Sequence, residues 1–476
     1  MTNLNKYRLI PSLFLVMHCF SQLPQVPVPN FNHSFPSSSP IQGARNITIN
    51  NDRTVIRESN IEAMKRTGNY IPTTIPPTDP IARHDFILRQ SDHQQSNREG
   101  EILTILQEAH ENERNNHPGV YYGKEFKELV DSYTNAFQVL KGMLSQPSTL
   151  SLKDAYYTIE SAYGSPYLTK QEFDWQIRNS AEFIKLWLVQ NGYNLHNSDH
   201  LHTGIQQFMK AELTITRKKP DSDEPPVTVK HLPFFYDYED FNGVKDFRNY
   251  FVTKAFASGG GQCSSLPIVY LVLAEALGVK AWMAFAPQHS FIKYKRRDGN
   301  IYNYEPTSGW HISDQWYIEN MGINREAIVS KIYFDTLTSK QIVANGMIDL
   351  SFGYLQKFGI GDANFVLNCL ETAQEYFPKK NNIYYYFMRS EIISRMLAHT
   401  IAFHQISVDQ IGAYPDARQL HDALLLNEDV IRSLGYVSMN ESLYQKLMEA
   451  HEFKSKLQQR ENISGKEKQN LFIESP

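Results

Sequence analysis

The sequence predicts an α+β fold in which antiparallel strands pack on a buried helix, with helical segments before and after this core. Three observations support this prediction. An almost unbroken apolar stretch at 264–278 matches a helix that is buried on all sides. Short strand-like segments joined by a tight turn follow it at 280–305. Apolar residues at helical spacing dominate the chain on both sides of this block.

Length and composition match an ordinary globular protein. The chain has 476 residues, enough for two or three domains, and is 41% hydrophobic and 21% charged, so a large core can form without a disulfide or metal. The formal net charge is −4, and acidic and basic residues are interspersed. We therefore expect no nucleic-acid partner, and no motif indicates a cofactor or a bound metal.

The first 21 residues have the features of a signal peptide. Lys6 and Arg8 form a short basic region, and residues 9–20 form an apolar stretch that is too short to cross a bilayer. Ser21 provides a small residue for cleavage. We therefore expect a secreted or periplasmic protein without stable membrane insertion.

Three cysteines do not form a disulfide framework. Cys19 is expected to leave with the signal peptide. It also allows a lipoprotein anchor, but His18 stands where lipoprotein signals have a small residue. Cys263 and Cys369 then remain, and a thiol in an exported protein is a liability unless it is buried, paired or used. Cys369 lies among apolar residues of a predicted helix, and we interpret it as a core residue.

Five segments divide the chain. They are a signal peptide at 1–21, a largely disordered linker rich in Pro, Ser and Asn at 22–95, a helical N-terminal region at 96–215, a mixed core at 216–347 and a helical C-terminal region at 348–476. The C-terminal region contains helix pairs, at 365–376 with 384–401 and at 420–434 with 443–457. These pairs are repeat-like, but no clean 34-residue self-match exists, so a generic helical tail is the alternative.

A glycine-rich turn at 259–261 leads into Cys263 and the apolar helix. Pro267 belongs in the first helical turn, so we expect the helix to begin near Ser264. Gly278 is a suitable C-terminal cap. Cys263 therefore lies at the mouth of a buried helix, where the positive end of the helix dipole favours a thiolate over a thiol.

The strands that follow are expected at 280–286, 289–294 and 301–305. Because side chains alternate along a strand, the length of the loop at 297–299 decides whether His289 and Glu305 share a face. A two-residue loop puts them on opposite faces, whereas a three-residue loop with a left-handed Gly299 pairs Phe291 with Glu305. We predict the three-residue loop, which makes the imidazole and the carboxylate diagonal neighbours.

Two motifs carry a family resemblance. Gly261-Gln-Cys263 opens an apolar helix that ends in Ala-Leu-Gly278, and a strand that begins at His289 precedes a strand that ends in Glu305-Pro-Thr-Ser. Over 241–309 the chain resembles the transglutaminase-like superfamily, and most closely a bacterial branch with tetratricopeptide-like helical tails. The resemblance implies a papain-like core with Cys263 as nucleophile, His289 as general base and Glu305 as orienting acid. Most of the superfamily has aspartate in place of this glutamate.

The expected function is that of a secreted cysteine enzyme acting on amide bonds of peptide or protein substrates. Cys263 would form a thioester, and water or an amine would then resolve it, giving hydrolysis or acyl transfer. The alternative is a catalytically inactive scaffold of the same fold that binds a protein partner, with the C-terminal helices as the contact surface. In that case Cys263 is a packing residue, and His289 and Glu305 are ordinary strand residues.

Other polar residues near the motifs keep open roles. Gln262 either donates to an oxyanion or caps the turn before the helix. Gln288 is equally open. Asn303, two residues before Glu305 on the same face, is the rival for orienting the histidine. A cluster near Asp199 has spacing that suits a metal but is interpreted as a polar loop or helix start; it consists of His196, His200 and His202.

Overall fold

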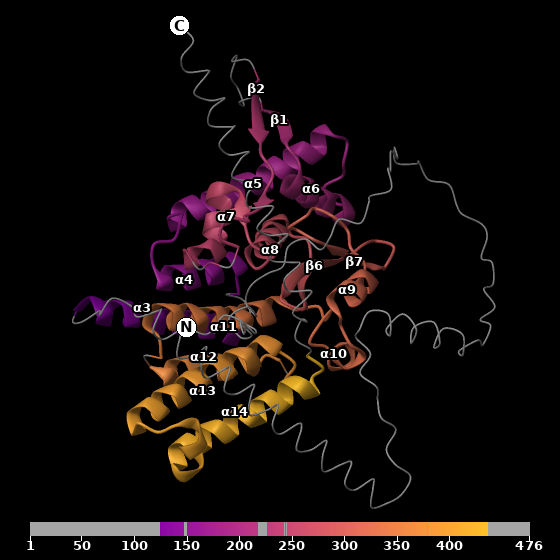
Figure 1. Ribbon diagram of the computed structural model, residues 1–476. Helices are drawn as coiled ribbons and strands as arrows, with labels where there is room; N and C mark the ends of the chain where they lie inside the picture. The colour runs from indigo at the N-terminus through magenta and orange to yellow at the C-terminus, as the bar shows by residue number, and fades with distance from the viewer. Residues whose placement is uncertain are drawn as a thin grey trace, which may run out of the picture. The chain divides into compact units, whose positions relative to one another are not determined.

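The computed structural model describes residues 124–146, 150–217, 226–241, 243, 245–360, 362–377 and 379–436. The predicted signal peptide, the linker, the first part of the N-terminal helical region and the last predicted helix at 443–457 lie outside these residues. The described part combines many helices with small sheets, which agrees with the expected α+β class (Figure 1).

Helices occupy most of the described chain. They are α3 (Lys124–Ser145), α4 (Leu152–Tyr163), α5 (Lys170–Gln190), α6 (Ser198–Lys210), α7 (Val252–Ser258), α8 (Ser265–Leu277), α9 (Asp314–Met321), α10 (Arg325–Ser330), α11 (Ser339–Phe358), α12 (Ala363–Gln374), α13 (Ile383–His404) and α14 (Pro415–Ser433), with the 3-10 helices η3 (Phe247–Tyr250) and η4 (Val408–Ala413). Polar side chains at the N-cap fix most starts, and α5 and α11 have full capping boxes that begin at Thr169 and Thr338.

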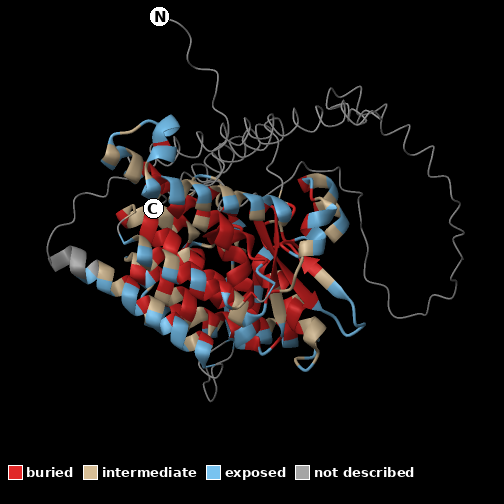
Figure 2. Ribbon diagram, turned by 90° about the horizontal axis from the view of Figure 1, so that it is seen from below, coloured by how far each residue is buried: buried red, intermediate tan, exposed pale blue. Residues whose placement is uncertain are grey.

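Helix α8 lies at the centre of the described elements, as its composition predicts. It packs against α4, α5, α6 and α7 and against two strands of the main sheet. Ser264 is its N-cap, and Gly278 ends it in a left-handed conformation with φ of 70°, so both predicted boundaries are confirmed. In Figure 2 buried residues fill the interior, and exposed ones lie on the outer faces of the surrounding helices.

The main sheet contains β5 (Ala281–Ala286), β6 (His289–Lys295) and β7 (Ile301–Tyr304), antiparallel and in that order. The predicted loop at 297–299 is confirmed, because Arg296 N–H donates to the Asn300 carbonyl at 3.0 Å and Gly299 has φ of 88°. Ile292 pairs with Tyr304, which is the register that the three-residue loop requires. Two smaller pairs complete the sheets: β1 (Leu213–Arg217) with β2 (Val227–His231), antiparallel, and β3 (Phe235–Tyr236) with β4 (Gly260–Gly261), parallel.

The C-terminal helices pack in series. Helix α11 lies against α3, α4 and α12, and α13 contacts both α12 and α14. The predicted pair at 365–376 and 384–401 corresponds to α12 and α13. Cys369 on α12 is a completely buried free thiol, which confirms its interpretation as a core residue.

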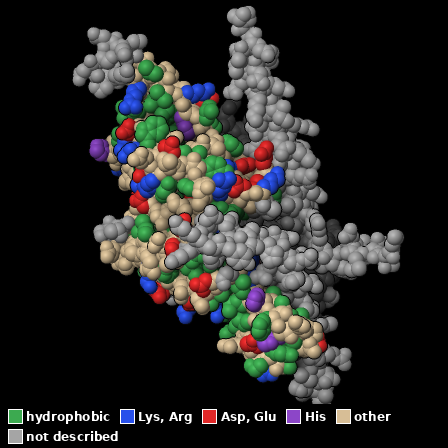
Figure 3. Space-filling model, turned by 90° about the vertical axis from the view of Figure 1, so that its left-hand side faces the viewer, with side chains coloured by type: hydrophobic (Ala, Val, Ile, Leu, Met, Phe, Trp, Pro, Cys, Tyr) green, Lys and Arg blue, Asp and Glu red, His purple; other side chains and the backbone are tan. Residues whose placement is uncertain are grey.

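The surface of the described region carries charges of both signs. On the face drawn in Figure 3, Lys and Arg side chains lie among Asp and Glu side chains, and neither sign gathers into a patch. Among the described helices, none has the combination of length and apolarity that crossing a membrane requires.

A buried ion pair lies inside α13. Arg395 is completely buried, and its Nε donates to Glu391 Oε1 at 2.6 Å from one turn earlier in the helix. Removing only one partner of such a pair leaves the other charge in a region of low polarity without compensation. The pair is therefore a sensitive test of how the C-terminal helices pack.

We expect Glu391→Gln to lower the free energy of unfolding by about 3 kcal/mol or more, because it removes a buried carboxylate charge that accepts from the Arg395 guanidinium. Urea denaturation of the full chain measures this loss. The matched control is Glu212→Gln, which removes the exposed pair with Lys230 and is expected to cost less than about 1 kcal/mol. Equal costs for the two variants would contradict the buried arrangement.

Candidate active site

The glycine turn before α8 brings the chain into a narrow space. Gly259 ends α7 with φ of 78°, a conformation that other residues adopt only with strain. Gly260 and Gly261 then pair with β3. A side-chain carbon at Gly261 would lie 2.8 Å from the Leu266 side chain, so the close approach to α8 requires glycine here. The turn therefore fixes the direction in which the chain enters Cys263.

Gln262 links this turn to its surroundings. Its Nε2 donates to the Asp237 carbonyl at 2.8 Å, and its backbone N–H donates to Ser265 Oγ at 2.9 Å. The side-chain amide is therefore engaged with the backbone beside β3. Of the two roles left open by the sequence, this arrangement favours the structural one, in which Gln262 stabilises the turn.

Cys263 is completely buried at the mouth of α8. Its carbonyl accepts a hydrogen bond from Ser290 Oγ at 2.5 Å, so its backbone is joined to β6 at the residue next to His289. The Cys263 sulfur is disulfide-bonded. Any nucleophilic chemistry of Cys263 therefore belongs to the reduced protein.

His289 and Glu305 meet as the register predicts. The imidazole Nε2 and the carboxylate Oε2 form a short hydrogen bond, and both side chains are buried. Oε2 also accepts from the Tyr317 hydroxyl at 2.8 Å. Oε1 accepts from the Thr307 N–H at 3.1 Å and from its hydroxyl at 2.8 Å. Four donors therefore hold the carboxylate in one orientation.

These contacts keep Glu305 ionised despite its burial. Burial alone would raise the pKa of the carboxyl group. The charge of His289 and the hydrogen bonds from His289 and Thr307 lower it further than burial raises it, so the pKa of Glu305 lies below its ordinary value of 4.5. A buried carboxylate that remains charged can orient an imidazole and stabilise its protonated form.

The second ring nitrogen of His289, Nδ1, is buried and makes no hydrogen bond among the described residues. With Nε2–H directed at Glu305, Nδ1 carries the lone pair that can accept a proton. No hydrogen bond joins this nitrogen to Cys263 in the described structure. The structure thus brings the imidazole and the carboxylate together, and connects the cysteine to them through its backbone and Ser290.

Asn303 has another partner. Its side-chain amide donates to Asp314 Oδ1 at 2.7 Å, and the same carboxylate pairs with Lys293 at 2.9 Å. The orienting role that the sequence left open between two residues therefore falls to Glu305. Gln288 occupies the two-residue turn between β5 and β6 with a left-handed φ of 53°, and its role stays open.

Two residues of the site were not predicted from the sequence. Tyr317 reaches Glu305 from α9, and its ring also stacks on Phe291 with centroids 4.6 Å apart. Tyr317 is distant in sequence from the strand, and no sequence pattern indicated this contact. Ser290 follows the predicted histidine directly, but nothing in the pattern indicated a bond to the Cys263 carbonyl.

The histidine cluster near Asp199 lies at the start of α6, as interpreted from the sequence. His200 Nδ1 accepts from the Asn194 N–H at 2.9 Å. His202 is buried and its Nδ1 lies 2.9 Å from the Tyr270 hydroxyl. Burial lowers the pKa of His202 to about 4, so this ring is neutral at neutral pH. No group of three or more metal-ligating side chains is found in the part of the chain that the structure describes.

Comparison of the chain with family models, curated proteins and solved structures finds no match.

We expect Glu305→Gln to lower the free energy of unfolding at pH 7 by about 1–3 kcal/mol, because it weakens buried charge-assisted hydrogen bonds. The folded-state pKa of Glu305 is depressed, so its contribution is present above the unfolded value of 4.5 and is lost as pH falls below it. Denaturation at pH 7 and near pH 4 measures both parts of this expectation. The exposed Glu319→Gln is the control, with a change below about 0.5 kcal/mol at either pH. If Glu305→Gln lowered the free energy of unfolding equally at both pH values, this expectation would be contradicted.

Proposed function

We propose that this protein is an exported cysteine enzyme with a transglutaminase-like core, which hydrolyses or transfers the acyl group of peptide amides. The observation that carries the proposal is the buried His289–Glu305 pair, with the carboxylate held by four donors and one imidazole nitrogen left unused. A carboxylate–imidazole pair of this kind beside a cysteine at a helix mouth is an arrangement suited to acyl transfer. The signal-like residues 1–21 support export.

In the proposed reaction the reduced Cys263 loses its proton to His289 and its sulfur attacks the amide carbonyl. The sulfur–carbon bond forms, the carbon–nitrogen bond breaks, and the imidazolium returns the proton to the leaving amine. Water or a second amine then attacks the thioester, and His289 takes the proton of this nucleophile and passes it to the departing sulfur. Glu305 stays ionised and stabilises the imidazolium throughout. Proton transfer from the Cys263 thiol requires contact between its sulfur and His289 Nδ1, which the reduced protein is proposed to form.

The alternative is a non-catalytic scaffold that binds a protein partner. The complete burial of Cys263 and its disulfide favour this alternative. The orientation of Glu305 toward His289 favours the enzyme, because a scaffold does not need a buried carboxylate that fixes an imidazole. The cysteine itself separates the two: a Cys263→Ala variant that keeps full biological function supports the scaffold.

Alkylation of the reduced protein tests the nucleophile. With a phosphine reductant at near-neutral pH, we expect iodoacetamide to label Cys263 at least about tenfold faster than Cys369. Both cysteines are completely buried, so a difference reflects thiolate character and local opening rather than static exposure. Burial raises the pKa of the Cys369 thiol, which makes it the internal control. His289→Ala is expected to slow labelling of Cys263. Equally slow labelling of both cysteines would contradict an activated nucleophile.

Turnover of peptide amides tests the triad. We expect Cys263→Ala to abolish kcat/KM, and Glu305→Gln to lower it by about 10³-fold or more because the imidazole loses its ionised partner. Tyr317→Phe removes one of four donors to the carboxylate and is expected to cost only about tenfold. A Glu305→Gln enzyme as active as the original chain, with a normal melting temperature, would exclude the proposed role of the carboxylate.

A further inference from the structure

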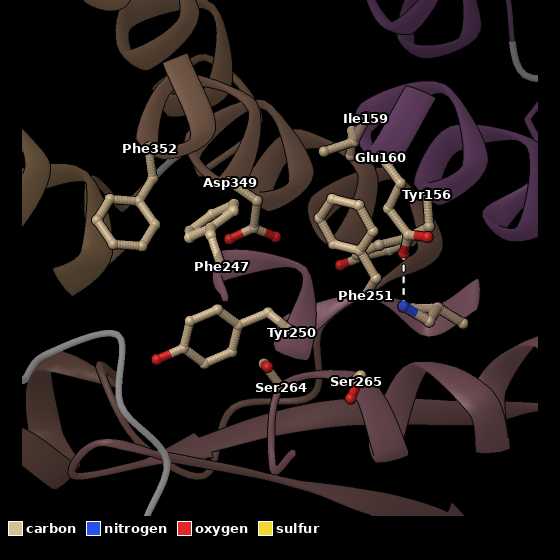
Figure 4. A pocket seen from close by; sticks show the side chains of 11 residues that line it. Tyr156, Ile159, Glu160, Phe247, Tyr250, Phe251, Ser264, Ser265, Asp349 and Phe352 are labelled. Atoms are coloured by element: carbon tan, nitrogen blue, oxygen red, sulfur yellow. Dashed lines mark hydrogen bonds between the residues drawn. The ribbon is translucent and has the colours of Figure 1, made fainter. Parts of the chain in front are cut away.

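A cavity of about 70 Å³ lies beside the residue that follows Cys263. This is room for several waters, since each needs roughly 10–15 Å³. Ser264 and Ser265 form one wall at the start of α8, and the opposite walls come from α4, η3 and α11. The cavity therefore adjoins the mouth of α8, where Cys263 lies (Figure 4).

The walls of the cavity are mainly aromatic. They bear five rings, those of Tyr156, Phe247, Tyr250, Phe251 and Phe352. Aromatic faces attract cations through their quadrupole, most strongly where water is excluded. The same lining has two carboxyl groups and no Lys, Arg or His. Both the rings and the charges therefore favour a positively charged occupant.

The two carboxyl groups differ in how they are engaged. Glu160 accepts hydrogen bonds from the Val252 N–H at 2.5 Å, from the Thr253 N–H at 3.1 Å and from the Thr253 hydroxyl at 2.6 Å, so it is used to cap α7. Asp349, on α11, makes no hydrogen bond or ion pair with any described residue. In Figure 4 its carboxylate points into the space between the rings, while Glu160 is turned to the Val252 backbone. Asp349 is therefore the group that a ligand would meet.

Among the described residues that line the cavity, none carries a positive charge that could compensate Asp349. The titratable groups that face it are Tyr156 and Glu160 on α4, Tyr250 on η3 and Tyr384 on α13. Burial raises the pKa of Asp349 from 3.8 to about 7. A carboxyl group in such a place is costly to ionise alone, but a cation placed against it supplies the missing partner.

From this arrangement we propose that the cavity is a binding site for an aliphatic ammonium group, such as that of a lysine side chain, held by Asp349 and the aromatic walls. Because Ser264 lines the cavity directly after Cys263, the ammonium group would belong to the substrate, next to the amide that Cys263 attacks. This second statement rests on the proposed function. The statement that the cavity binds an ammonium group does not depend on the proposed function, and it is tested without turnover.

Binding of n-butylammonium to the full-length Cys263→Ala variant tests the site, with n-butanol as the neutral probe of similar shape. We expect the ammonium to bind at least about tenfold more tightly than the alcohol, because only the cation gains the carboxylate and the ring faces. In Asp349→Asn this preference is expected to disappear, whereas in the control Asp422→Asn, an exposed carboxylate on α14, it is expected to persist. Equal affinity for the two probes in the unchanged cavity overturns the proposal.

The pH dependence provides a second measurement, made on the original chain and on Asp349→Asn, because burial also raises the pKa of Glu160 in the same cavity to about 7. The carboxyl group must ionise to pair with the ammonium, so affinity is expected to rise between about pH 6 and pH 8. Affinity that does not change over this range overturns the role of Asp349. The Asn variant is expected to fold, since the raised folded-state pKa means that Asp349 costs stability increasingly from about pH 4 to pH 7 and in full above pH 7. Its melting temperature at pH 8 is therefore expected to equal or exceed that of the original chain.

The substrate role is tested with two peptide amides that differ only in lysine or norleucine beside the attacked bond. We expect kcat/KM to favour lysine by about tenfold in the original chain and to show no preference in Asp349→Asn. If butylammonium binds but the two peptides react equally, the site remains and its substrate role is excluded. If no peptide reacts, the proposed function fails, and the binding result stands by itself.

Discussion

The rest of the structure depends on the burial of α8, a helix whose apolar side chains point in every direction. Such a helix has no face that can be left in water, so α4, α5, α6, α7 and the main sheet must all pack on it. Each large side chain buried in this way contributes roughly 1.5–3 kcal/mol, which makes full coverage the strongest local preference of the chain. Packing on all sides of α8 holds both ends of the helix in place. The first turn of the helix then holds Cys263 against β6.

Two buried carboxyl groups show how their contacts determine the charge of a site. Glu305 is the less exposed of the two, yet its donors keep its pKa below the ordinary value, whereas burial raises that of Asp349 to about 7. The first is a permanent charge with a fixed direction, suited to orienting a ring. The second is a group that ionises only near neutral pH, and a bound cation would stabilise its charge. Their different environments therefore give the two carboxyl groups opposite pKa shifts.

The elements around the site were predictable because their signals are local. Pro267 and Gly278 bound α8, and the turn at 297–299 determines which residues of β6 and β7 share a face. By contrast, Tyr317 and Asp349 reach the region from helices whose sequence patterns say only that they are helical. Their roles arise from how α9 and α11 pack, and packing between distant segments leaves no periodic trace in one sequence.

The disulfide of Cys263 was not expected, because three cysteines in the sequence did not suggest a disulfide framework. Counting cysteines gives the number of possible pairs but not their geometry. The prediction that the chain has no disulfide framework therefore had little physical basis. The transglutaminase-like resemblance rests on the short motifs around Cys263, His289 and Glu305.

The exposed hairpin at 297–299 has a consequence for how this chain can vary. Loop tips usually tolerate insertions and deletions, because they cross open solvent. Here the number of residues in the tip determines which residues of the two strands share a face of the sheet. Adding or removing one residue would turn His289 and Glu305 to opposite sides. Relatives that keep the pair are therefore expected to differ in amino-acid type at the tip but not by a single residue in its length, although the tip itself touches neither side chain.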